Sequence, residues 1–326
     1  MRRFILTAIL TMGLLACSVP AVKSLAEPET QPLLVADLPT DLAEDKAGLD
    51  EFADLLEDYR QMNDRLDRVS APLRLANADL CQKTFRDPGF RVHSLADYPE
   101  ELRGVAQSLM GVEPDAIYVR SVRRGSPAEK ADIQTGDRIL RLNGQAVPGG
   151  PTMIRFYRAL SRGAFGGLTT QLTLRTPDGR DYETSLQAET ACDYQTRVFY
   201  SEDVNGHTDG REVYVTSELM RVVPDDVNLA LIVAHEMAHA IAGHMEEIPT
   251  RELELEADRM ALVLMERAGY DIDAAIAYWA AAAHPHRALQ DKSKSHPTIS
   301  ERDANFKKEQ ARIKEVKRAG KTLKFK

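Results

Sequence analysis

The chain has 326 residues, and its 42 basic and 50 acidic side chains give it a formal net charge of −8 at pH 7. This length predicts two folded units with additional segments. The acidic balance, and the lack of a basic, aromatic-rich module in the sequence, exclude a nucleic-acid-binding function.

The N-terminal segment has the features of an export signal. Two arginines precede an apolar run, Phe4–Leu15, that is too short to span a bilayer as a mature helix. Residues 1–17 end in Leu14-Leu-Ala-Cys17, which resembles the signal of bacterial lipoproteins, where the cysteine becomes the lipidated first residue. A buried structural cysteine is the alternative. Since Ser18 follows, the resemblance to lipoproteins of Gram-negative bacteria implies a lipid anchor in the outer membrane, facing the periplasm.

Two cysteines remain once Cys17 is lipidated. An even pair in an oxidising compartment predicts a disulfide between Cys81 and Cys192. Two unrelated buried thiols are the alternative. No CxxC arrangement occurs in the sequence, so a cysteine-bound zinc site is excluded.

Residues 18–42 are predicted to be a polar tether, and residues 43–94 an N-terminal helical segment. Apolar residues between Gly48 and Ser70 recur at near-heptad spacing, which predicts a helix. Pro72 is expected to end this helix. Because fewer than four heptads are present, we expect the helix to pack on its own chain rather than to form a dimeric coiled coil.

Residues 95–190 are predicted to form a separate, β-rich domain. An alternating strand over 117–122 leads into Gly125-Ser-Pro-Ala, a turn and short helix, and then into Gly136-Asp-Arg-Ile and an Asn-Gly hairpin. This order resembles a PDZ domain, a module that captures an extended peptide or a C-terminus by adding it as a strand to a sheet edge. The resemblance implies such a partner here, with its carboxylate near Leu109–Val112. The alternative is a small β domain that only packs on its neighbour.

The stretch His235-Glu-Met-Ala-His239 carries the strongest chemical signal. Residues four apart on a helix share one face, so both imidazoles can bind one zinc ion at about 2.0–2.1 Å. Glu236 lies beside them, where it can hold a metal-bound water without being a ligand. An apolar stripe that includes Leu229, Ile232 and Val233 predicts that the helix is buried. The alternative is an amphipathic helix with two core-facing histidines.

The next predicted helix contains Glu252-Leu-Glu-Leu-Glu-Ala-Asp258. Catalytic zinc takes three protein ligands and leaves a fourth position to water, and Glu254 is the candidate for the third ligand. Asp258 follows four residues later on the same face, where it can accept a hydrogen bond from a ligating imidazole. Glu252 and Glu256 are possible substitutes as third ligand, but both point to other faces of the helix. A solvated helix surface is the alternative for the whole acidic run.

Together with Ser295-His-Pro-Thr-Ile-Ser-Glu-Arg302, these motifs resemble the gluzincin family of the CaaX prenyl proteases and the HtpX-like and Oma-like peptidases, which is metallopeptidase family forty-eight. The resemblance implies that Glu254 ligates zinc and that Asp258 supports the site. It also implies that His296 approaches the metal or the oxyanion and that Arg302 holds this region. In one departure from the family, the long insertion that many relatives carry between the two zinc motifs is almost absent.

The implied fold class is α+β multidomain: a mostly helical zincin protease domain with a small edge sheet at residues 191–326, preceded by the β-rich PDZ-like domain. The resemblance covers residues 195–310, and Val213–Arg221 matches the strand and turn that lead into the active-site helix. A metzincin is excluded, because its third histidine would fall at Met245. His244 is one residue early and is expected to be a helix-end residue.

The expected function is that of a zinc-dependent endopeptidase of the bacterial cell envelope, which holds one Zn²⁺ per chain and degrades unfolded or misassembled proteins. Glu236 would act as general base on a zinc-bound water, and His296 would stabilise the oxyanion. Substrate is expected along an edge strand formed by Val213, Tyr214 and Val215. The alternative is a lipid-tethered PDZ-type chaperone or adaptor with a latent protease site, in which His296 occupies the water position. A non-proteolytic metal hydrolase has no supporting motif.

Overall fold

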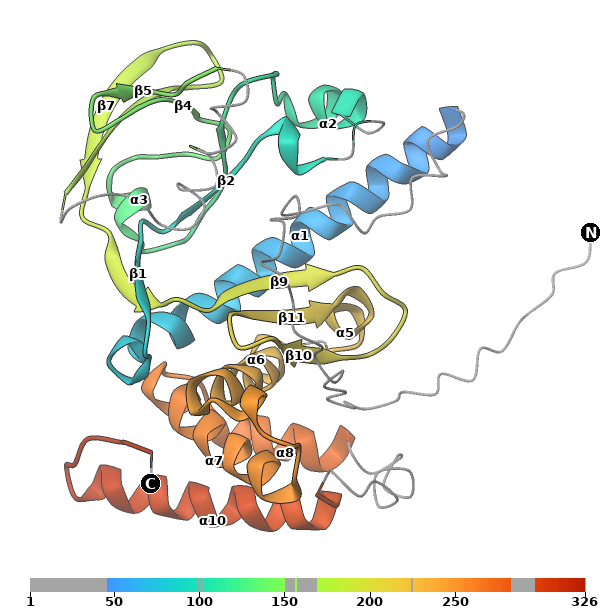
Figure 1. The fold of residues 1–326 in the computed structure, drawn as a ribbon, viewed down its shortest axis with the longest axis vertical. Helices are drawn as coiled ribbons and strands as arrows, with labels where there is room; N and C mark the ends of the chain where they lie inside the picture. The colour runs from blue at the N-terminus through green and yellow to red at the C-terminus, as the bar shows by residue number, and fades with distance from the viewer. Residues whose placement is uncertain are drawn as a thin grey trace, which may run out of the picture.

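The computed structural model describes residues 46–98, 100, 103–149, 156, 169–223, 225–282 and 297–325. The predicted signal with Cys17, the predicted tether and His296 lie outside these residues. Figure 1 shows a β-rich region and a mostly helical region, with the long helix α1 (Lys46–Ala76) running between them. The predicted α+β multidomain class is therefore confirmed. Within the described ranges, no helix combines the length and the apolar character needed to cross a membrane.

The β-rich region is built on a six-stranded antiparallel sheet with the order β2-β3-β4-β6-β7, in which β5 pairs with β4. Its strands are β2 (Phe90–His93), β3 (Tyr118–Val122), β4 (Arg138–Leu142), β5 (Gln145–Ala146), β6 (Thr170–Arg175) and β7 (Asp181–Leu186). Its helices are η3 (Leu95–Asp97), α2 (Arg103–Met110) and α3 (Pro127–Lys130). Alternate side chains of the strands, such as Ile139, Leu172 and Leu174, form a separate core on one face.

Two predicted positions in this region differ from the structure. The sheet begins at Phe90, before the predicted domain boundary at residue 95, because β2 pairs with β3 from Phe90 to His93. Leu109–Val112, the predicted carboxylate loop, forms the end of α2 and the turn after it. The edge strands of the sheet are instead β2 and β7.

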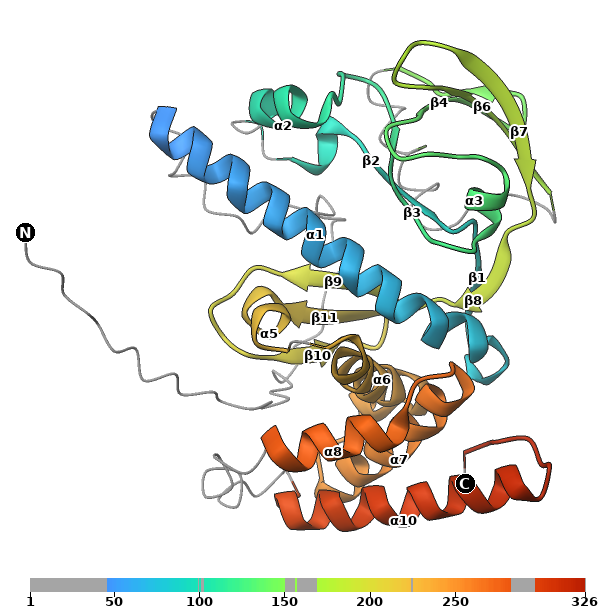
Figure 2. The same ribbon diagram turned by 180° about the vertical axis from the view of Figure 1, so that it is seen from behind.

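The helical region contains α1 and further helices that surround α6 (Figures 1 and 2). These are η2 (Ala78–Leu80), α5 (Ser217–Val222), α6 (Asp226–Ala242), η5 (His244–Glu246), α7 (Arg251–Arg267), α8 (Ile272–Ala282) and α10 (Ile299–Arg318). α6 packs against α1, α7 and α8, and α10 packs across α7 and α8.

α1 packs on its own chain, as expected. Its apolar face shares one buried core with α6, α7 and α10; the side chains that α1 contributes to this core are Phe52, Leu56, Tyr59, Leu66, Val69 and Leu73. The helix also covers one edge of strand β9 (Gln195–Phe199). The Tyr59 hydroxyl donates to the carbonyl oxygen of Val198 at 2.5 Å, and the N–H of Val198 donates to Asn63 Oδ1 at 3.2 Å. These side chains take the place of a neighbouring strand.

α1 continues through Pro72, so the prediction that this proline ends the helix is wrong. Proline removes one helical hydrogen bond, and burial outweighs that loss here. Leu73 is fully buried, and the buried Arg74 guanidinium donates to Asp67 Oδ1 at 3.0 Å. These contacts hold the last turn of the helix.

A three-stranded sheet lies beside α6, with the order β10-β11-β9. β10 (Gly206–Thr208) is antiparallel to β11 (Glu212–Thr216), and β9 is parallel to it. Since β11 has a neighbour on each side, the prediction that Val213, Tyr214 and Val215 form an edge strand is wrong. The alternating sequence shows which side chains face the core, but it does not show how many strands pair with β11. Because α1 covers β9, the outer strand next to α6 is β10.

A disulfide joins Cys81 to Cys192, whose Cα atoms are 5.5 Å apart. Next to it, β1 (Thr84–Asp87) pairs in antiparallel fashion with β8 (Glu189–Cys192). The chain therefore enters and leaves the β-rich region through two paired strands.

Candidate metal centre

α6 carries the motif His235-Glu-Met-Ala-His239 through the centre of the helical region. The helix begins at Asp226, whose carboxylate complements the helix dipole and pairs with Arg65 of α1 at 2.9 Å. It ends at Gly243, whose φ of 77° lies in the left-handed region that favours glycine. Every residue from Asn228 to Ile241 is buried, so the motif is held on a rigid element.

The three predicted ligands lie together. His235, His239 and Glu254 each offer one ligand atom, and these atoms are within 4.8 Å of one another. The two Nε2 atoms are 3.1 Å apart, and the Glu254 oxygens lie 3.5 Å from His235 Nε2 and 3.6 Å from His239 Nε2. Glu254 reaches this point from the first turn of α7, which Thr250 caps. Two imidazoles and a carboxylate are a donor set of catalytic zinc, so the residues fit this ion.

The second ring nitrogen of His235 faces a buried ion pair. His235 Nδ1 is 3.1 Å from Asp258 Oδ1, and Arg302 Nε donates to the other oxygen of Asp258 at 2.8 Å. The Arg302 guanidinium in turn stacks 4.3 Å from the ring centre of Trp279. Burial acts to raise the pKa of Asp258, but Arg302 and His235 outweigh it and hold that pKa below its ordinary value. An ionised Asp258 can therefore accept the Nδ1 hydrogen of His235 and orient its Nε2 toward the metal position.

The second ring nitrogen of His239 faces another histidine. His244, at the start of η5, is buried, and its Nδ1 is 3.0 Å from His239 Nδ1. Its Nε2 points toward the carboxylate of Glu256, at 3.7 Å. Burial lowers the pKa of His239 to about 3, with a further contribution from His235. The neutral His239 ring can thus offer Nε2 to a metal while its Nδ1 hydrogen is held by His244.

Glu236 is buried and lies against β10. Gly206, the first residue of β10, approaches α6 so closely that a Cβ atom there would be 3.1 Å from Ile232 Cγ2 and 3.7 Å from Glu236 Cγ. A side chain at position 206 would require the Ile232 side chain to move by a few tenths of an ångström. β10 is therefore set directly beside the predicted general base.

Sequence reasoning missed the role of two elements at this site. His244 was expected to be a helix-end residue; it does lie just past α6, and its contact with His239 comes from the turn at Gly243. Its spacing of five residues from His239 was the available signal. β10 is only three residues long and has no alternating pattern to predict it.

Comparisons with known proteins identify both regions. Residues 184–248 and 248–310 match the model of peptidase family M48, and residues 118–172 match a PDZ domain model. No curated protein matches the chain.

Among solved structures, the PDZ domain of HtrA3 bound to a phage-derived ligand is 23% identical; the match covers 33% of this chain and 88% of that chain, with a TM-score of 0.24. The HtrA-type protease AlgW matches in a structure with a decapeptide at 22% identity, over 33% of this chain and 30% of that chain, and again with a TM-score of 0.24. A structure of AlgW with a tripeptide matches at 23% identity over 33% of each chain, with the same TM-score.

Proposed function

Because this chain is an M48 peptidase with a PDZ domain, we propose that it is a zinc-dependent endopeptidase that cleaves unfolded or misassembled proteins of the bacterial cell envelope. The observation that supports the zinc assignment most directly is the meeting of His235, His239 and Glu254 in one buried cluster. Each histidine has its second nitrogen held by a further side chain, which is the arrangement that metal-ligating histidines need.

Glu236 is the proposed general base. A bound zinc ion would act as a Lewis acid on the attacking water and on the peptide carbonyl. Glu236 would take the proton of the water as it attacks and deliver it to the leaving amine. Its burial beside β10 keeps the carboxylate next to a bound substrate.

His296 remains the proposed oxyanion donor. It precedes Pro297, which is buried, and α10, which brings Arg302 to Asp258. A ring N–H aimed at the oxyanion would lower the barrier by about 2.7–4 kcal/mol.

β10 is the proposed substrate strand. An extended peptide that pairs with its outer edge would pass beside Glu236, and main-chain hydrogen bonds would give affinity with little sequence selectivity. Such binding requires an unfolded chain. We also propose that the PDZ domain binds a peptide or a C-terminus of the same substrates, since strand addition is the usual recognition mode of this module.

The proposed location is the outer membrane, with a lipid anchor on Cys17 facing the periplasm. The support is the Leu14-Leu-Ala-Cys17 sequence followed by Ser18. Labelled palmitate should enter the wild-type protein and not Cys17→Ala. Labelling of both proteins, or of neither, would contradict the anchor.

Metal removal tests the proposed function. The mature protein purified in detergent is expected to contain one zinc ion per chain and to degrade casein. Chelation should abolish this activity, and stoichiometric zinc should restore it, because the ligands form a single site. If the metal-free protein degraded casein as fast as the zinc-loaded protein, the proposal would be wrong.

A further inference from the structure

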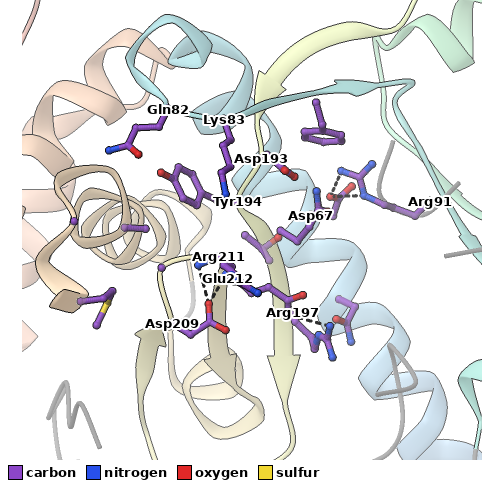
Figure 3. A pocket seen from close by; sticks show the side chains of 18 of the residues that line it. Asp67, Gln82, Lys83, Arg91, Asp193, Tyr194, Arg197, Asp209, Arg211 and Glu212 are labelled. Atoms are coloured by element: carbon purple, nitrogen blue, oxygen red, sulfur yellow. Dashed lines mark hydrogen bonds and ion pairs between the residues drawn. The ribbon is translucent and has the colours of Figure 1, made fainter. Parts of the chain in front are cut away.

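A cavity of about 1120 Å³ lies between the helical region and the β-rich region. Figure 3 shows its lining, which comes from α1, the loop before β1, the start of β9 and the turn between β10 and β11. The end of α6 and the following turn close one side, through Ala242, Gly243 and Met245. On another side, β2 of the PDZ sheet contributes Phe90 and Val92.

The cavity begins where β10 ends. At the start of this strand, Gly206 lies against Glu236 of α6. Beyond its other end, Gly210 lies against the turn that follows α6, where a Cβ atom would be 3.2 Å from Met245 Cγ. β10 therefore runs along α6 from the proposed general base toward the cavity, and both Gly210 and Met245 line it.

The direction of β10 decides which part of a substrate reaches the cavity. Antiparallel pairing is the more stable arrangement per residue, and it reverses the direction of the added strand. A peptide paired in this way with Gly206–Thr208 has its N-terminal side toward Thr208 and hence toward the cavity. Its C-terminal side leaves in the opposite direction, past Asn205.

The lining contains both basic and acidic side chains, so it can contact polar segments of a polypeptide that carry either charge. Two of its ion pairs are internal: Arg91 with Asp67 at 2.6 Å, and Arg197 with Glu212 at 2.9 Å. In the part of the chain that the structure describes, Arg120 pairs with Asp64 of α1, and the remaining charged groups of the lining form no ion pair; these are Lys83, Asp193, Asp209, Arg211, Glu246 and Glu247.

Gln195, at the start of β9, also lines the cavity. Its Nε2 atom is buried, so it belongs to the wall and is not reachable from the cavity. The cavity surface therefore offers charged groups of both signs.

We propose that this cavity is a substrate passage: it holds the segment of an unfolded polypeptide that lies N-terminal to the bond being cut. This inference rests on the proposed endopeptidase function and adds a length requirement to it. Chains that extend several residues on the N-terminal side of the cut fill the passage and are cleaved faster than short peptides. The passage also leads a bound chain from the zinc centre to the PDZ sheet.

The proposed passage can be tested on the wild-type protein by comparing how fast it cleaves peptides of different length. Three fluorescence-quenched peptides would share one sequence around a bond that the enzyme cuts in casein. One has two residues on each side of that bond, one has ten on the N-terminal side, and one has ten on the C-terminal side. The N-terminally extended peptide is expected to have a kcat/KM at least tenfold above the other two. Equal values, or a preference for the C-terminal extension, would overturn the proposal.

Two substitutions that add a large side chain to different walls of the cavity provide a second test. Ala242→Trp acts from the exposed last turn of α6, and Lys83→Trp acts from the exposed loop before β1. Each should remove the advantage of the N-terminally extended peptide and leave cleavage of the short peptide within about twofold of wild type. Ala311→Trp, on an exposed face of α10 away from the cavity, is the matched control and should change neither value.

The outcomes separate the two proposals. If the zinc-loaded wild type cleaves no peptide, the endopeptidase function fails, and the passage fails with it. If it cleaves all three peptides equally, only the passage fails. If one tryptophan variant does not fold, the other variant and the length comparison still decide.

Discussion

Glu236→Gln is expected to retain one zinc ion per chain and to lose about 10²–10⁴-fold in kcat/KM, the usual contribution of a positioned general base. Glutamine has nearly the same shape as glutamate but cannot take a proton. Glu236 is 2% exposed and packs beside Gly206, so a side chain of the same size should leave β10 in place. Zinc content by mass spectrometry and casein cleavage would be measured on the same preparation.

Glu252→Gln is the control for this experiment. Glu252 is an exposed glutamate in the first turn of α7, on a different face from Glu254. This control should behave as wild type in both measurements. Full activity in the zinc-loaded Glu236→Gln protein would show that another group acts as the base. Loss of zinc from it would instead place Glu236 among the ligands.

Asp258→Asn is expected to give the largest combined loss of metal affinity and stability. Asparagine is neutral and leaves the buried Arg302 guanidinium without its counter-charge, which typically costs about 3–5 kcal/mol. It also weakens the hydrogen bond that orients His235, and such changes cost about 10–100-fold in metal affinity. Competition with a zinc chelator and urea unfolding of the metal-free protein would measure the two effects separately.

The pH dependence of the same variant gives an independent check. The pKa of Asp258 is lowered in the folded protein, so its contribution to stability is present above the unfolded-state pKa of about 3.9. That contribution is lost as the pH falls through the folded-state pKa. The difference in unfolding free energy between wild type and Asp258→Asn should therefore be constant near pH 7 and shrink below about pH 4. A difference that grows in acid would show that the Asp258 carboxylate does not stabilise the fold.

His244→Ala provides a comparison at the other histidine ligand. Its partner His239 is neutral, so no buried charge is left uncompensated. We expect weaker zinc binding with a smaller loss of stability than in Asp258→Asn. Equal losses in the two variants would contradict the different roles assigned to the two contacts.

The cluster of His235, His239 and Glu254 and the helices that carry it could be predicted because the relevant information is local. His235 and His239 are one turn apart on a helix whose apolar pattern is unbroken, and Thr250 starts the helix that returns Glu254. The PDZ strands could be predicted for the same reason, since each lies between recognisable turns.

Other features depend on contacts between distant segments, and sequence patterns do not show these. The short strand β10 exists only because it pairs with β11 and packs on α6. Pro72 stays inside α1 because residues far along the chain bury the turn that contains it. The cavity arises from segments spread between Asn63 and Glu247, so no single stretch predicts it.

The disulfide between Cys81 and Cys192 lies where the β-rich region joins the helical region. The chain crosses from the helical region to the β-rich region and back through β1 and β8, which are paired beside that bond. The six-stranded sheet thus lies in sequence between α1 and the rest of the helical region, which holds His235, His239 and Glu254. Exchange of this sheet for another module would leave α1, α6 and α7 in contact. The sheet has a core of its own, so the cluster of His235, His239 and Glu254 is built without residues from it.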